Sequence, residues 1–325
     1  MNTVEDARRF LRPHESLASF LDRALVEPTR TGIGFIDRAR ASRRGALEPG
    51  EILEIVGAAG CGKTALVTEI ASRAVLPSTS HGVAFDGSSA TCVVIDCDGK
   101  FDALRLLRTT DEKIADGIAR AGGGGGGGAR EEVYEEAMSR FSLVRAHGVV
   151  DVLKTLVALD AAWSGEVDAS GGGGFGGMDL GFGRVEGGGL KQGEGSKSRQ
   201  RLVMIDNVAA FYWLDRASRK DHDAPYNIQR VFSAMARLLK RLATTHRAAI
   251  VVTKATLSST SDYRPGGEYR DFLPLEWSSA VTQRILLSPS HERVEYGEYA
   301  GVATWDAPAK WRGGKFIVTE QGIRC

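Results

Sequence analysis

Residues 52–74 read ILEIVGAAGCGKTALVTEIASRA, and this stretch decides the fold. Its centre, residues 57–64, matches the pattern G-x-x-x-x-G-K-[ST], in which glycines let successive backbone N–H groups face a chain of phosphates. The apolar run before it predicts a buried strand, and residues 65–74 predict a helix whose positive end faces the same phosphates. The stretch therefore predicts the strand, loop and helix of a nucleotide site in an α/β protein.

The loop supplies each group that a triphosphate with its metal requires. We expect ATP to be bound by Gly57, Ala58, Ala59, Gly60, Cys61, Gly62, Lys63 and Thr64. The lysine would contact the β- and γ-phosphates, and the hydroxyl of Thr64 would ligate Mg²⁺. ATP and Mg²⁺ are thus the expected cofactors.

Two more carboxylates follow predicted strands. Asp206 ends the apolar run LVMID and is expected to hold Mg²⁺ through water; the alternative is an ordinary strand ending in a capping Asp. Asp98 follows the strand 93–96 and is a weak candidate for activating the attacking water, with Asp96 second. Asp is one methylene shorter than Glu, and a misplacement of ~1 Å can cost on the order of a hundredfold in rate.

The remaining apolar patterns extend this unit into an α/β fold. Further buried strands are predicted at 141–144 and 250–253, and a helix over 227–245 has an apolar stripe at helical spacing. A second helix is expected around 149–157. After residue 274 four short strands are predicted, at 284–287, 293–296, 302–305 and 315–319. The fold class is therefore a mostly parallel sheet flanked by helices, with antiparallel strands at the C-terminal edge.

Glycine marks two insertions. Of the 40 glycines, 7 lie in residues 122–128 and 14 in residues 165–199, and such segments cannot bury a core. We expect an N-terminal segment, 1–45, with a short helix near 15–26, and an ATPase domain, 46–325, with disordered Gly-rich inserts at 121–129 and 165–199. Whether the inserts have a function is left open.

Charge and cysteine usage narrow the class of protein. The net charge is +1, so any DNA contact must be local or shared with a partner. The four cysteines show no metal spacing, which fits a reducing compartment. No apolar run approaches the ~20 residues of a membrane span. We therefore expect a cytosolic or nuclear protein that does not associate with a membrane.

Several segments resemble the RecA-like recombinases of eukaryotes, and within them the small paralogues that lack an N-terminal helical domain. The segment IDCDGKF at 95–101 looks like that family's I-D-T-E-G-T-F, and AFYWLDR at 210–216 is the most specific likeness. WSSAVTQR at 277–284 and KFIVTEQG at 315–322 also fit. The resemblance covers about residues 30–325 outside the inserts and implies a RecA-like P-loop ATPase core.

The resemblance also implies a function. Such a protein acts in the nucleus in homologous-recombination repair of double-strand breaks, as a subunit of a paralogue complex that assists the main recombinase on single-stranded DNA. Its partners would be other recombinase paralogues, in particular the D paralogue of the group. Two departures weaken the catalytic reading: Asp98 stands where catalytic members carry Glu, and residues 253–255 read TKA where they carry Thr-Asn-Gln.

Two loops of that family face DNA, here about residues 209–224 and 256–280. The candidate contacts are Arg216, Arg219, Lys220, Arg264 and Arg270. Nearby Asp and Glu residues offset their positive charge, so we expect weak binding to single-stranded or branched DNA. At most a weak DNA-dependent ATPase activity is predicted. The alternatives are an autonomous DNA-dependent ATPase that performs strand exchange and a P-loop small-molecule kinase; the latter would need an arginine-rich lid.

Overall fold

The computed structural model describes residues 28–37, 47–122, 127–164, 200–217, 227–256, 269, 271–290 and 292–325. Their centre is a nine-stranded sheet in the order β11-β10-β9-β8-β1-β7-β6-β4-β5. Its parallel part consists of β1 (Ile52–Gly57), β4 (Thr91–Asp96), β5 (Phe141–Arg145), β6 (Arg201–Asp206), β7 (Ala249–Ala255) and β8 (Gln283–Pro289). The carboxyl ends of these strands therefore meet at one edge of the sheet, where ligands bind in open α/β folds.

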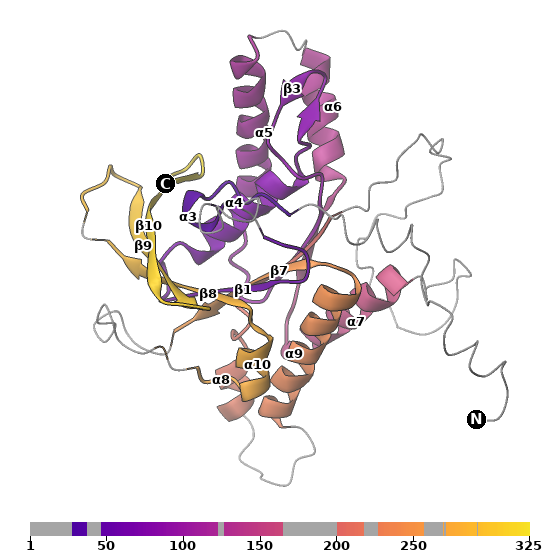
Figure 1. The fold of residues 1–325 in the computed structure, drawn as a ribbon, viewed down its shortest axis with the longest axis vertical. Coiled ribbons are helices and arrows are strands. Elements are labelled where there is room, and N and C mark those ends of the chain that lie inside the picture. The colour runs from indigo at the N-terminus through magenta and orange to yellow at the C-terminus, as the bar shows by residue number, and fades with distance from the viewer. Residues whose placement is uncertain are drawn as a thin grey trace, which may run out of the picture.

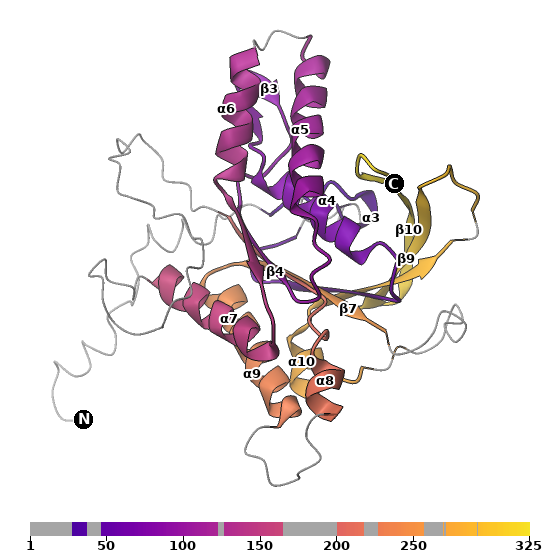
Figure 2. The ribbon, with the colours of Figure 1, turned by 180° about the vertical axis from the view of Figure 1, so that it is seen from behind.

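Helices cover both faces of the sheet, because successive residues of its strands are buried on alternate sides. In β6, Leu202 and Met204 belong to one apolar core, whereas Val203 and Ile205 belong to the other. As Figures 1 and 2 show, α4 (Lys63–Val75), α5 (Ala103–Arg120) and α6 (Gly127–Met138) lie on one side, with α5 and α6 side by side. The opposite side carries α7 (Val149–Ser164), α8 (Tyr212–Ala217), α9 (Ile228–Thr245) and α10 (Leu275–Ala280).

The C-terminal edge is antiparallel. There β9 (Tyr299–Ala307) pairs with β8 and with β10 (Trp311–Val318), and β11 (Ile323–Arg324) completes the sheet. Figure 1 shows this group at one side of the sheet, near the C-terminus. The predicted fold class is thus confirmed. One detail was wrong: residues 293–296 form no strand, because polar and exposed residues follow β8 there and the chain turns at 296–297.

Smaller elements complete the described chain. α3 (Gly34–Asp37) precedes the sheet, and a hairpin of β2 (Thr79–Ser80) and β3 (Val83–Ala84) forms a separate two-stranded sheet. The helix predicted over 227–245 is α9, which begins after Asn227; the side chain of this residue accepts a hydrogen bond from the backbone N–H of Gln229. That contact satisfies one of the N–H groups that a helix start leaves open.

The two Gly-rich inserts differ in what the structure describes. The insert predicted at 121–129 overlaps the start of α6 at Gly127, and the insert at 165–199 lies outside the described residues, as does the predicted helix at 15–26. The residues that flank the second insert lie close together: the guanidinium of Arg201 is 5.0 Å from the ring of Trp163. Side chains from the two segments that flank the insert are therefore in contact.

Candidate nucleotide site

The phosphate loop joins β1 to α4, as its sequence predicts. Gly57 approaches its surroundings so closely that a Cβ atom would lie 2.4 Å from the Sγ atom of Cys61. Gly62, the residue before the helix, has φ +89°, a left-handed conformation that favours glycine. The pattern therefore demands glycine at these positions for steric reasons. The turn directs the N-terminus of α4, a site for anions, toward the carboxyl edge of the sheet.

The side chain of Lys63 folds back over the preceding residues of the phosphate loop. Its ammonium group donates to the carbonyl oxygens of Gly57, at 2.9 Å, and Ala58, at 2.7 Å. Burial raises the pKa of the neighbouring Cys61 thiol, so this residue acts in the loop as a small apolar side chain. A compact cation is thus held where phosphates approach the backbone amides.

The tips of β4, β6 and β7 bring the carboxylates to the loop. Asp96 and Asp206 are direct neighbours on β4 and β6, and both are buried. The hydroxyl of Thr253, on β7, donates to Oδ1 of Asp206 at 2.6 Å and accepts the backbone N–H of Asn207 at 2.7 Å. Burial raises the pKa of Asp206, and the hydroxyls of Thr253 and Thr64 oppose that rise.

The donor set fits a magnesium ion. Oδ2 of Asp206 is buried and has no hydrogen-bond partner among the described residues, and the same holds for Oδ2 of Asp96. Thr64 lines the same cavity as Asp206. Hard oxygen donors of this kind suit Mg²⁺, which binds to one or two protein groups, several waters and substrate phosphates. These side chains would hold the ion beside the phosphates. There the ion would withdraw negative charge from the phosphate oxygens.

A single cavity unites the predicted residues. Its volume is about 390 Å³, and its lining includes Lys63, Thr64, Asp98 and Asp206. Its size and its cation, hydroxyl and carboxylate groups are those that a nucleotide triphosphate requires. Five of the eight loop residues line it: Ala59, Gly60, Gly62, Lys63 and Thr64. The carbonyl oxygens of Gly57 and Ala58 instead accept hydrogen bonds from Lys63, and Cys61 is buried.

Asp98, the candidate for water activation, lies in the same cavity but is engaged by neighbours. Its Oδ2 accepts the side-chain amide of Asn207 at 3.0 Å and lies 3.3 Å from the ammonium of Lys100. Ala255, at the tip of β7, presents only a methyl group to this cavity. The polar side chain that the resemblance leads one to expect there is missing.

Sequence reasoning missed several residues of the cavity. Arg105 lines it and donates to the backbone carbonyl of Thr319 at 2.6 Å, so α5 is tied to the C-terminal strands. Lys100, Asn207 and Tyr299 also line it. The rule that adjacent parallel strands converge at their carboxyl ends points to Asn207, next to Asp206. No local pattern points to Tyr299, because the register of the antiparallel strands places it there.

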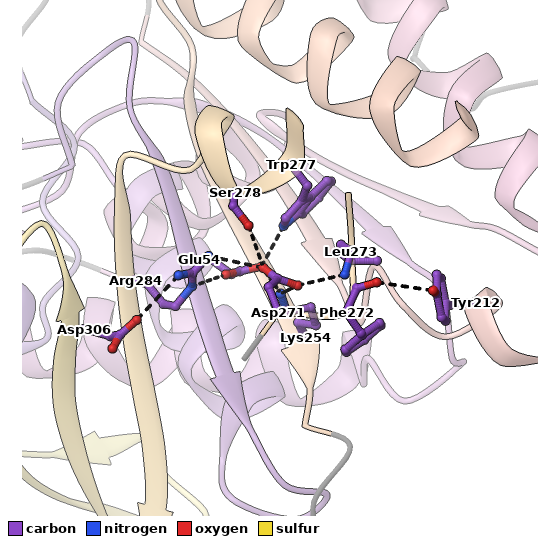
Figure 3. Close-up of polar contacts among 10 residues, drawn as sticks. All are labelled: Glu54, Tyr212, Lys254, Asp271, Phe272, Leu273, Trp277, Ser278, Arg284 and Asp306. Carbon is purple, nitrogen blue, oxygen red and sulfur yellow. Dashed lines mark hydrogen bonds and ion pairs between the residues drawn. The ribbon is translucent and has the colours of Figure 1, made fainter. Parts of the chain in front are cut away.

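A buried ionic cluster surrounds Lys254 of β7, the residue before Ala255, and includes Asp271 of the second predicted DNA loop (Figure 3). Fully buried Lys254 contacts Glu54 of β1 at 2.7 Å and Asp271 at 2.8 Å. Arg284 of β8 contacts both carboxylates and Asp306. The cluster therefore joins β7 and the returning end of that loop to the centre of the sheet, a feature that sequence reasoning missed.

The predicted DNA contacts are only partly described. Arg219, Lys220, Arg264 and Arg270 lie outside the described residues. Arg216 lies on α8, where its guanidinium is 5.5 Å from the ring of Trp213 and 3.4 Å from the hydroxyl of Tyr212. Tyr212 is a core residue, and Trp213 is 44% exposed. Among the described residues, no helix has the length and apolar character that crossing a bilayer requires.

Comparison with known proteins finds relatives over most of the chain. It is 23% identical to the DNA repair protein XRCC2 homolog of Arabidopsis thaliana, covering 97% of this chain and 89% of the relative. It is 22% identical to XRCC2 of Mus musculus, covering 84% of each chain. It is 25% identical to the DNA repair protein RAD51 homolog 4 of Bos taurus, covering 86% of this chain and 66% of the relative. No protein-family model matches the chain. These similarities confirm the resemblance inferred from the sequence, and with the sheet order they identify a RecA-like core.

Proposed function

On the premise that this chain is an XRCC2-like RAD51 paralogue, we propose that it is an ATP-binding protein of homologous-recombination repair. It acts in the nucleus on double-strand breaks, as a subunit of a paralogue complex that assists the main recombinase on single-stranded DNA. Other recombinase paralogues are its partners, in particular the D paralogue of the group. The names of its relatives support the repair role.

The observation that carries ATP binding is the convergence of Lys63, Thr64 and Asp206 on one cavity. They come from the loop after β1 and from the tip of β6, two strands away in the sheet. Nucleotide phosphates would contact the loop amides and Lys63, while Thr64 and Asp206 would hold Mg²⁺. A kinase has no comparable support, because Lys100 and Arg105 are the cavity's only described basic residues besides Lys63, too few for an arginine-rich lid.

We infer that ATP binding serves assembly more than turnover. Ala255 has no polar group with which to link the γ-phosphate to the loop that follows β7, and Asp98 is already engaged by Asn207. An autonomous strand-exchange ATPase would need both functions. An adaptor role, in which bound ATP stabilises the fold and a partner interface, therefore fits the cavity better than autonomous strand exchange.

The test separates binding from hydrolysis. Replacing Lys63→Ala removes the cation, and Lys63→Arg keeps the charge but changes its shape. Titration with a fluorescent ATP analogue and Mg²⁺ should show that Lys63→Ala weakens binding by at least about tenfold, the loss of one charged hydrogen bond. Wild-type protein that binds no ATP would refute the proposal.

A complementation assay in cells that lack the protein then decides the role of ATP. If ATP only stabilises the fold and a partner interface, Lys63→Ala should reduce partner capture and repair together, because it weakens ATP binding. Loss of repair with intact partner capture would instead favour the strand-exchange ATPase. The control is Lys310→Ala, which removes an exposed lysine far along the sequence, at the β9–β10 turn.

A further inference from the structure

We propose that Asn207 is a positioning residue that holds Asp98 in a non-catalytic orientation and thereby suppresses ATP hydrolysis. This inference rests on the proposed ATP binding at the cavity and names a means by which turnover at the same site is limited. It concerns the residues of this chain that surround Asp98, the first candidate for water activation. Asn207 is the residue directly after Asp206, and Asp98 follows β4.

Both oxygens of the Asp98 carboxylate have partners. Oδ2 accepts the amide of Asn207 at 3.0 Å and faces the ammonium of Lys100 at 3.3 Å, and Oδ1 accepts the backbone N–H of Lys100 at 3.4 Å. A carboxylate that orients water must offer it a lone pair in the right direction. Here the side chain instead serves as an acceptor that joins the tips of β4 and β6.

Asn207 is itself held firmly. Its φ of +59° is left-handed, a conformation that Asn adopts more readily than most residues. Its backbone N–H donates to the hydroxyl of Thr253, which donates in turn to Asp206. The amide that engages Asp98 is thus fixed by the same hydroxyl that fixes the carboxylate expected to hold Mg²⁺.

Of the two side chains that face Asp98, Asn207 has the greater influence. The side chain of Lys100 is 66% exposed, whereas that of Asp98 is only 18% exposed. Ion pairs with an exposed member are screened by solvent and contribute little. A hydrogen bond from a fixed amide to a partly buried carboxylate persists, so removing Asn207 should have the larger effect.

The restrained reaction is simple hydrolysis. The oxygen of water forms a bond to the γ-phosphorus, and the bond from that phosphorus to the bridging oxygen breaks, with its electron pair leaving on ADP. The proton of water passes to a carboxylate or to solvent. Releasing Asp98 would let this carboxylate turn toward the water that attacks.

The decisive variant is Asn207→Gly, because glycine keeps the left-handed backbone and removes only the amide. Single-turnover hydrolysis should rise about tenfold, the rate equivalent of one hydrogen bond to a charged group. Affinity for the ATP analogue should stay within about threefold. Adding Asp98→Asn to this variant should remove the gain, whereas the control Lys310→Gln, at an exposed lysine that does not line the cavity, should leave the rate unchanged.

A second measurement does not depend on turnover. In the NMR spectrum of the full chain, the side-chain amide of Asn207 should give two distinct signals that shift strongly in Asp98→Asn and little in Lys310→Gln. Unchanged hydrolysis in Asn207→Gly, with ATP bound as in the wild type, would overturn the inference. The inference would also be overturned if the side-chain amide signals of Asn207 did not shift in Asp98→Asn. Failure of the wild type to bind ATP would instead refute the proposed function.

Discussion

Asp206 combines its proposed role at the metal with a cost to stability. Its carboxylate is buried beside Asp96 and Asp98, and burial raises its pKa. A carboxyl group whose pKa is raised on folding binds more protons in the folded state, so stability falls as pH rises above the pKa of the unfolded chain, ~3.9. In the nucleotide-free protein this residue therefore lowers stability at neutral pH.

We expect Asp206→Asn to stabilise the nucleotide-free protein and to abolish Mg²⁺-dependent nucleotide binding. The amide keeps the shape and the bond from Thr253 without the buried charge. The midpoint of thermal unfolding at pH 7 should rise by roughly 2–4 °C, the shift for about 1 kcal/mol in a large domain. The gain should shrink when the measurement is repeated near pH 4. A lower midpoint at pH 7 would contradict this account.

Lys254 should be among the most sensitive residues in the chain. Replacing Lys254→Met leaves Glu54 and Asp271 with Arg284 as their remaining cationic partner in the cluster of Figure 3. Breaking a buried ion pair from one side costs about 3–5 kcal/mol. Urea unfolding should report a loss of that size, whereas Lys310→Met, at an exposed lysine, should change stability by less than about 0.5 kcal/mol. A loss below about 1 kcal/mol for Lys254→Met would mean that the cluster contributes little.

At the scale of elements, the sequence predicts the elements that carry the site and misses those that complete it. The strands β1, β4, β6 and β7 are rich in apolar residues, so their identity and order along the chain can be predicted from the sequence. Tyr299 and Val318 reach the cavity only through the register of β9 and β10, which depends on pairing between distant segments. Likewise, Lys254 reads as an ordinary strand-end residue until Glu54 and Asp271 are placed beside it.

The insert at 165–199 should be dispensable for folding. Because Trp163 and Arg201 lie in contact across its ends, a 12-residue Gly/Ser linker can replace it. Shortening the loop changes its closure entropy by about 1 kcal/mol, so the free energy of unfolding should change by no more than that. Affinity for the ATP analogue should be unchanged. A larger loss of stability, or weaker binding, would assign a structural role to the insert.

For the whole molecule, the net charge determines how strongly we expect the chain to bind DNA. A net charge of +1 gives little long-range attraction to phosphates, and Arg216 is engaged with Trp213 and Tyr212. The isolated chain should bind single-stranded DNA with a dissociation constant in the range of about 10⁻⁴–10⁻⁶ M at physiological salt. The complex with its paralogue partner should bind more tightly and with a steeper salt dependence. Nanomolar binding by the isolated chain would contradict the adaptor reading.

The four cysteines differ in their surroundings: Cys61, Cys92 and Cys97 are buried, whereas Cys325 is exposed. Burial raises the pKa values of the three interior thiols and so keeps them protonated. A maleimide dye should therefore attach at one position in the native protein, without removal of any other cysteine. Cys325 and Trp311 line the same small surface hollow, so indole quenching of a suitable dye would test whether the surroundings of the C-terminal strands change when a partner is added.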